Sequence, residues 1–471
     1  MNGLYKTKLS SILSAMPVSE WRSLTDFIRS GLGGPAGKSI ELIEFLLVNY
    51  KDWRHERLTR ETVFEQLFPD EQYQDKKLRY AMTDLSRQAS AFLGVKSLLA
   101  DEGWAGSFLK QELVVRKADK AYLSEHDDSD TKLIHETVSD VEMYFLRFRD
   151  TYTYMNHFLP RQKRTGKNPA GLAASYLDKF YVARKLQLLC EMVNSRNVMA
   201  IDYDYFMQED IVRRMKEGAF ADEPLISIYF RILMTLTEPE DVNHFDLLRK
   251  LLEEKTAGIN KNELSDMYQY LMNYCIRKIN TGNTAYVETL FEIYQTVIER
   301  KIIYRGSFLS QWDFKNIVVI GLRAGEHEWV FEFINKYKDD LPAEERENAW
   351  TYNKAYYHFA TGDYKRSISL LQQVEFTDLY YQLDTRAIML KCYYELHDEE
   401  TLLYHLAAFK IFLTRNKLIS EYQRTIYRNL VKFTNRLVRH ASDQTERHKM
   451  LEELNEVKQV ADINWLRKKL G

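Results

Sequence analysis

The stretch NKAYYHFATGDYKRSISLLQQV, residues Asn353 to Val374, contains two helical segments separated by a tight turn. Ala355 lies on the first segment, while Ser367 and Leu371 lie four residues apart on the second, which is the spacing of one helical turn. Gly362 stands between them, and glycine adopts the left-handed backbone that often ends a helix without steric cost. The stretch therefore predicts two helices that fold back on one another.

The same pattern recurs along the second half of the chain. Comparable turns stand at Gly282, Gly325, Gly362 and His397, at separations of 43, 37 and 35 residues. An apolar or small residue lies seven positions before each turn and another lies nine positions after it, as stacked helix pairs require. The first set is Cys275, Val318, Ala355 and Leu390, and the second is Phe291, Ile334, Leu371 and Leu406.

These residues resemble the tetratricopeptide repeat (TPR) family. The best match is again Asn353 to Val374, with small Ala355, the turn at 362–364 and Pro342 ending the preceding unit; His397 and Leu402 depart from the family pattern. The resemblance covers Asn168 to His440 and implies a right-handed α-solenoid of antiparallel helix pairs. Two further stretches, LRYAMTDL at Leu78 to Leu85 and RNKLISEYQR at Arg415 to Arg424, resemble a group of uncharacterised bacterial helical-repeat proteins.

Composition favours an all-α protein of the cytoplasm. Helical periodicity fills most of the segments between the 8 prolines, and a net charge of -2 gives no general attraction to nucleic acid or anionic lipid. The 3 cysteines are far apart in apolar helical contexts, which is typical of free thiols in a reducing compartment. No secretory signal or membrane span is evident, so we expect no membrane association.

The N-terminal region predicts a different kind of helical domain. Helices expected at 41–50, 60–67 and 75–93, followed by a short hairpin within Ser97 to Lys117, resemble a winged helix-turn-helix in their order. The third helix has an apolar seam of Leu78, Met82, Leu85, Ala89 and Phe92. Its opposite face carries Lys76, Arg79, Thr83 and Arg87.

That opposite face has two interpretations. It could enter the major groove of DNA, or it could be an ordinary solvated helix face. Residues 1–100 contain 14 Lys and Arg against 12 Asp and Glu, which is far from a basic DNA-binding footprint. Nucleic acid therefore stays an alternative partner that the charge does not favour.

The stretch SGLGGPAGKSIELIEF, Ser30 to Phe45, suggests a phosphate-binding loop but fails on spacing. A P-loop needs glycine five positions before the Gly-Lys pair, and Leu32 stands there. An amphipathic helix, rather than a buried strand, precedes it. We expect a turn between two helices, with Ser39 capping the second.

Motifs for catalysis and metal binding are missing from the sequence. There is no HExxH, GxSxG or paired CxxC, and His135-Glu136 has no second histidine one turn later. We expect no enzyme activity, no cofactor and no metal. A catalytic site assembled across the repeats stays the weakest alternative.

A TPR-like array implies a concave groove lined by the first helix of each pair. Registers counted from the turns place five residues there: Lys315, Tyr352, Tyr356, Lys391 and Tyr394. Tyrosine and lysine suit an extended peptide with acidic groups, although each tyrosine could instead pack between repeats. We therefore predict a scaffold that binds a protein or peptide partner; the alternative is a transcription regulator with a DNA-binding front domain and a sensor array.

The expected domains follow in chain order. Residues 1–125 form the N-terminal domain, 126–168 a linker helix and basic linker, 169–440 the array, and 441–471 a capping helix. In that last helix Met450, Leu454, Val457 and Ala461 form a seam. We expect Leu454 and Val457 to bury against the helix of Tyr427, Leu430 and Leu437; the competing interpretation is a free amphipathic helix that docks a partner or dimerises.

Overall fold

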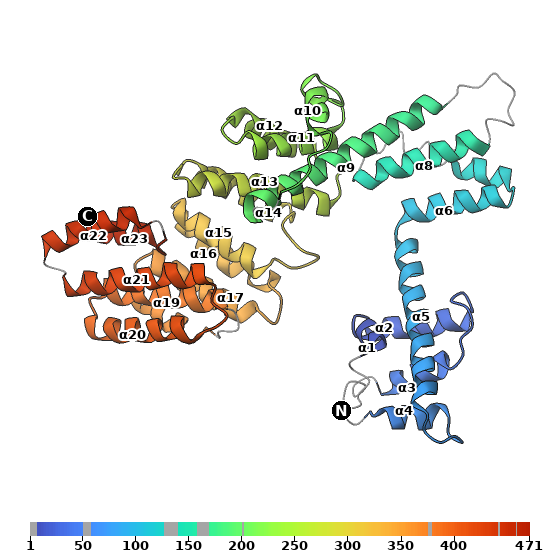
Figure 1. The fold of residues 1–471 in the computed structure, drawn as a ribbon, viewed down its shortest axis with the longest axis horizontal. Helices are drawn as coiled ribbons and strands as arrows, with labels where there is room; N and C mark the ends of the chain where they lie inside the picture. Colours follow the sequence, from blue (N-terminus) through green and yellow to red (C-terminus); the bar gives the residue numbers. More distant parts are fainter. Residues whose placement is uncertain are drawn as a thin grey trace. The chain divides into compact units, whose positions relative to one another are not determined.

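The computed structural model describes residues 7–49, 58–126, 140–157, 169–199, 202–374, 379–440, 443–457 and 459–471. The described residues are mainly helical and contain no strand, so the expected all-α class is confirmed (Figure 1). The chain separates into two compact units, Met1–Lys185 and Leu186–Gly471. No helix of the described residues is long and apolar enough to cross a membrane.

Unit 1 has its main core among its first five helices. Trp21, Leu42 and Leu85 are fully buried there, and the whole predicted seam from Leu78 to Phe92 lies in this core. The later helices α6 and α8 pack on one another, and Asp150 of α8 accepts hydrogen bonds from Ser107 and Lys110. The bounds are α1 Lys8–Ser14, α2 Val18–Arg29, α3 Ser39–Val48, α4 Arg60–Leu67, α5 Asp75–Ala100, α6 Glu102–Val115 and α8 Val141–His157.

The hairpin expected within Ser97 to Lys117 is wrong, because this stretch is helical. Helix α5 continues to Ala100, and Asp101 then starts α6 by accepting a hydrogen bond from the backbone N–H of Trp104 at 3.0 Å. The β-branched residues that suggested a strand lie in the last turn of α6. The capped helix therefore overrides a local β preference of only a few residues.

Unit 2 contains five consecutive helix pairs in which each helix packs on the next (Figure 1). First helices also pack on neighbouring first helices, as α11 does on α13, α15 on α17 and α17 on α19. The pairs are α11 Pro224–Thr237 with α12 Val242–Glu254, α13 Lys261–Asn280 with α14 Tyr286–Glu299, α15 Gln311–Arg323 with α16 His327–Lys336, α17 Arg346–Ala360 with α18 Tyr364–Leu371, and α19 Leu379–Glu395 with α20 Glu399–Arg415. The other elements are α9 Ala170–Met199, whose C-terminal part belongs to unit 2, α10 Gln208–Lys216, η3 Lys338–Asp340, α21 Glu421–Arg439, α22 Gln444–Glu456 and α23 Ile463–Leu470.

All four predicted turns have a left-handed backbone, at His397 as well as at the three glycines. Their φ angles are 99° at Gly282, 83° at Gly325, 84° at Gly362 and 55° at His397. Two hydrogen bonds close each turn in the same way. The N–H of the turn residue donates to the carbonyl three residues earlier, and the N–H of the following residue donates to the carbonyl five residues before itself. This is the Schellman motif, which satisfies the last carbonyls of a helix. The repeated turn chemistry is therefore confirmed.

The eight anchor residues around these turns are all buried. The most exposed of them is Phe291, with 6 % of its surface accessible. All three cysteines are free and buried, as expected, and burial raises the pKa of the Cys275 thiol to about 12 and that of Cys392 to about 11. These thiols therefore act as small apolar core groups.

The C-terminal segment is two helices instead of the single helix that we expected. Helix α22 ends at Glu456, and Asp462, with a φ of 50°, precedes α23. The predicted packing is seen for Leu454, which is fully buried in one cluster with Leu430 and Leu437, whereas Val457 is only half-buried against that cluster. The break lets α23 add Leu466 and Leu470 to the same core.

Candidate binding sites

The five predicted groove residues lie in one part of unit 2, where their partners belong to the same chain. Lys315 on α15 pairs with Asp384 on α19, which also accepts a hydrogen bond of 2.8 Å from the Tyr427 hydroxyl. The Lys315 ammonium lies 5.4 Å and 5.6 Å from the ring centroids of Tyr352 and Tyr381. Its charge is therefore already balanced by a carboxylate and two aromatic faces.

The C-terminal segment contacts the groove residues of α19. The Lys391 ammonium is 2.9 Å from a carboxylate oxygen of Asp462, and Lys391 is only 6 % exposed. The rings of Tyr394 and Trp465 meet edge to face at 5.3 Å. Glu395 accepts a hydrogen bond of 3.0 Å from the indole Nε1 of Trp465. Residues that we expected to face a peptide thus hold the end of the protein's own chain.

Burial also changes the electrostatics of the groove tyrosines. Tyr352 is fully buried, and this burial raises the pKa of its hydroxyl well above the usual value. Burial, together with the charges of Asp462 and Asp384, raises the pKa of Tyr356 to about 12. Both hydroxyls are therefore neutral hydrogen-bonding groups at physiological pH. An acidic peptide would have to displace the carboxylates of Asp384 and Asp462 before it could pair with these lysines.

The predicted basic face of the third N-terminal helix is exposed on α5, at Lys76, Arg79, Thr83 and Arg87. Two of its cations already have partners. Arg79 pairs with Asp75 at 2.9 Å, and Arg87 donates hydrogen bonds of 2.9 Å and 3.1 Å to the carbonyls of Gly33 and Pro35. The Arg87 hydrogen bonds hold α5 to the loop between α2 and α3, so part of this face already has a structural role.

A cavity of about 460 Å³ opens beside that face. Its lining includes four cationic side chains and no carboxylate. Two of the cations, Lys8 and Arg60, come from α1 and α4, and the sequence pattern of α5 alone could not place them there. The lining residues are Thr7, Lys8, Leu9, Arg60, Arg79, Met82, Thr83, Ser86, Arg87 and Ser90.

The glycine-rich loop between α2 and α3 does not have the form of a phosphate-binding loop. The carbonyls of Gly33, Gly34 and Pro35 point to Arg87 and Gln88, whereas a P-loop would present N–H groups to an anion. The loop is a turn between helices, as predicted. The expected cap is wrong, because Ser39 is the first residue of α3 and its buried hydroxyl makes no hydrogen bond within the described residues.

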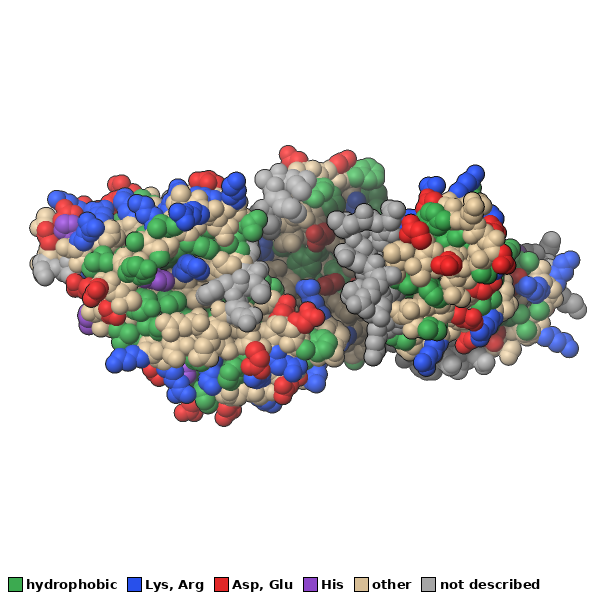
Figure 2. Space-filling view, turned by 90° about the horizontal axis from the view of Figure 1, so that it is seen from below, with side chains coloured by type: hydrophobic (Ala, Val, Ile, Leu, Met, Phe, Trp, Pro, Cys, Tyr) green, Lys and Arg blue, Asp and Glu red, His purple; other side chains and the backbone are tan. Residues whose placement is uncertain are grey.

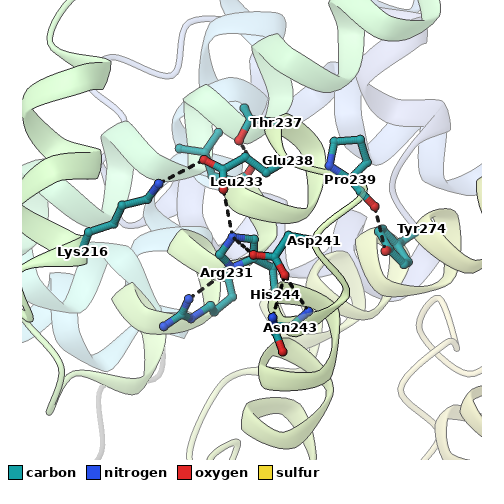
Figure 3. A network of polar contacts seen from close by, with 10 residues as sticks. All are labelled: Lys216, Arg231, Leu233, Thr237, Glu238, Pro239, Asp241, Asn243, His244 and Tyr274. Atoms are coloured by element: carbon teal, nitrogen blue, oxygen red, sulfur yellow. Dashed lines mark hydrogen bonds and ion pairs between the residues drawn. The ribbon is translucent and has the colours of Figure 1, made fainter.

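A polar network closes the turn of the first pair, which has no glycine (Figure 3). Nε2 of His244 lies 3.1 Å from Glu238 and 3.5 Å from Asp241, and its Nδ1 lies 3.3 Å from the Arg231 guanidinium (Figure 3). The ammonium of Lys216 is 3.0 Å from Glu238. These hydrogen bonds from Lys216 and His244 lower the pKa of the Glu238 carboxyl.

Glu238, Asp241 and His244 have the residue types of a metal site, and their ligand atoms lie within 4.8 Å of one another. The hydrogen bonds favour a structural role. Arginine can only donate, so Nδ1 of His244 accepts from Arg231 and Nε2 carries the proton that goes to Glu238. If Nε2 bound a metal ion, the ring proton would be on Nδ1. That N–H would then point at the Arg231 guanidinium, which is also a donor. Lys216 already pairs with Glu238, and Asp241 accepts hydrogen bonds from the backbone and side chain of Asn243, so we interpret this network as the closure of the α11–α12 turn.

An exposed apolar stripe runs along α20, and sequence reasoning missed it. Tyr404 is 80 % exposed, Ile411 52 % and Leu403 40 %, and the alanines 407 and 408 between them are also exposed. Figure 2 shows hydrophobic side chains on this end of unit 2, drawn at the left. The stretch EETLLYHLAAFKIFLTR is apolar on two faces. A second apolar face beside the core face was the signal that could have revealed the stripe.

Two sequence features lie outside the described residues. These are the His-Glu pair at 135–136 and residues 161–167 of the predicted basic linker.

No protein-family model, curated protein or solved structure matches this chain.

Proposed function

We propose that this chain is a non-enzymatic scaffold that binds a protein partner on a helical repeat array. In this proposal the five pairs from α11 to α20 form a right-handed, TPR-like solenoid. The recurring Schellman turns and the contacts between successive first helices support it. Free buried thiols support a cytoplasmic location.

The exposed stripe of α20, defined as Leu403, Tyr404, Ala407, Ala408 and Ile411, carries the proposal. Large apolar side chains in one exposed row are unusual on a monomer and mark interaction sites. A tyrosine flanked by aliphatic residues offers contact area together with a polar tip. We therefore assign the partner to this outer face and not to the groove, whose lysines are paired within the chain.

A quantitative capture experiment tests this assignment. Full-length wild type, the double variant Tyr404→Glu with Ile411→Glu, and the control Leu99→Glu are used to capture proteins from the source cells. Leu99 is an exposed apolar residue of unit 1, at 69 %. The proposal expects one protein that is lost with the double variant and kept with the control. Equal capture by all three forms would contradict it.

The alternative of a nucleic-acid-binding regulator has one observation in its favour. The cavity beside α5 brings Lys8, Arg60, Arg79 and Arg87 together with hydroxyl groups, and its lining has no carboxylate. Such a set suits a backbone phosphate. Binding of a labelled DNA duplex that weakens steeply with salt, and that Lys8→Ala with Arg79→Ala reduces, would support this function over the scaffold.

A further inference from the structure

A second cavity lies in unit 2 between α10, α11 and α12. Its volume is about 490 Å³, which is within the usual range for small-molecule sites. Met215, Phe230, Leu247 and Leu251 give it an apolar interior. Leu247 is 42 % exposed even though it lines the cavity, so apolar surface is open to solvent there. A ligand with an apolar body would cover it.

The rim of this cavity is cationic. Lys216, Arg231, Lys250 and Lys255 line it, and Glu254 is the single carboxylate among the lining residues. Lys216 is paired with Glu238. Within the described parts of the chain, Lys250 and Lys255 form no ion pair. The cavity therefore has an excess of positive charge that this chain does not neutralise locally.

Arg231 provides the most specific group. Its guanidinium is half-buried, and its hydrogen bond goes to Nδ1 of the His244 ring rather than to a carboxylate (Figure 3). Burial lowers the pKa of Arg231, and the nearby charge of Asp241 offsets this cost only in part. The network of Glu238 and His244 fixes Arg231 and Lys216 on the cavity side of the turn. A planar guanidinium held in this way can bind a carboxylate or phosphate through two hydrogen bonds.

We propose that this cavity binds a small amphipathic anion, with its apolar chain on the Met215, Phe230 and Leu251 surface and its charged head beside Arg231, Lys250 and Lys255. The site is separate from the α20 stripe, so it adds ligand binding to the scaffold and does not depend on that function. Carboxylate and phosphate heads share the required chemistry. The experiment below distinguishes them.

Binding of decanoate, decyl phosphate, decanol and decylammonium to the full chain is measured by isothermal titration calorimetry. At least one of the two anions should bind with one-to-one stoichiometry, and whichever binds more tightly identifies the head group. Decanol and decylammonium should bind at least tenfold more weakly than the anion, because neither offers an anionic head to the Arg231 guanidinium.

A pair of variants connects the binding to this cavity. Lys250→Gln with Lys255→Gln should weaken anion binding by about fivefold or more, since the two charges are exposed and removable without loss of a core contact. Lys365→Gln with Lys410→Gln removes two other exposed lysines and should leave binding unchanged. Circular dichroism verifies that both forms fold. The proposal would be overturned if neither anion bound, if decanol bound as tightly as the anions, or if both double variants bound the anion equally well.

Discussion

Two equivalent turns of the array, at Gly362 and His397, should respond in opposite directions to exchange of their residues. Both have positive φ, 84° and 55°, and the same pair of closing hydrogen bonds. A Cβ added to Gly362 would meet no atom within 4 Å. Substitution there therefore changes the backbone energy without a steric clash.

The magnitudes follow from the left-handed backbone. An L-residue in this conformation destabilises the folded protein by about 1–2 kcal/mol. Replacing glycine also restricts the unfolded chain, which stabilises the folded protein by about 0.4–1 kcal/mol. Gly362→Ala should therefore destabilise the protein by about 1 kcal/mol, and His397→Gly should stabilise it by up to about 1 kcal/mol.

Urea unfolding of the full chain, followed by far-ultraviolet circular dichroism, measures both changes. Gly94 provides a control, because it lies inside α5 and an added Cβ there would also meet no atom within 4 Å. Gly94→Ala should stabilise by about 0.5–1 kcal/mol. If Gly362→Ala and His397→Gly shift the unfolding free energy in the same direction, the equivalence of the two turns is refuted.

Three further changes test the packing of unit 2. Gly321→Ala should destabilise by about 1–3 kcal/mol in a thermal melt, because its Cβ would lie 2.5 Å from Val330; an unchanged melt would contradict the close approach of α15 and α16. Burial lowers the pKa of His405, outweighing its hydrogen bond to the Arg386 carbonyl, so the unfolded chain binds the proton first and stability should fall as the pH drops below about 6.5. Urea midpoints on either side of that pH should show a smaller loss for His405→Gln than for wild type. Deletion of 446–471 should lower the melting temperature and expose apolar surface to a dye, whereas a deletion that is equally stable would favour a docking helix.

The repeated turns could be predicted because their chemistry is local. A glycine at Gly282, Gly325 or Gly362, with apolar residues at helical spacing on both sides, determines a Schellman turn within a few residues. The turn between α11 and α12 has no such glycine, and it closes through side chains of Glu238 and His244 instead. The apolar periodicity of one helix gives no indication of such a network of side chains.

The environment of the groove residues could not be predicted for a different reason. Lys315 meets Asp384, which is 69 residues later in the chain, and Lys391 meets Asp462 beyond three further helices. A register counted from one turn places a side chain on a helix face but not the element that covers the face. The break at Asp462 brings α23 onto this surface, and the continuous apolar seam gave no sign of that break.

Photocrosslinking from α20 in living cells tests the scaffold proposal most directly. A photoreactive amino acid replaces Tyr404, which is 80 % exposed, and in a parallel strain it replaces Leu99 of unit 1. The proposal expects an adduct with one partner protein from position 404 that is missing from position 99 and that Ile411→Glu abolishes. No protein adduct from position 404, or the same adducts from both positions, would contradict the assignment of the partner to the α20 stripe.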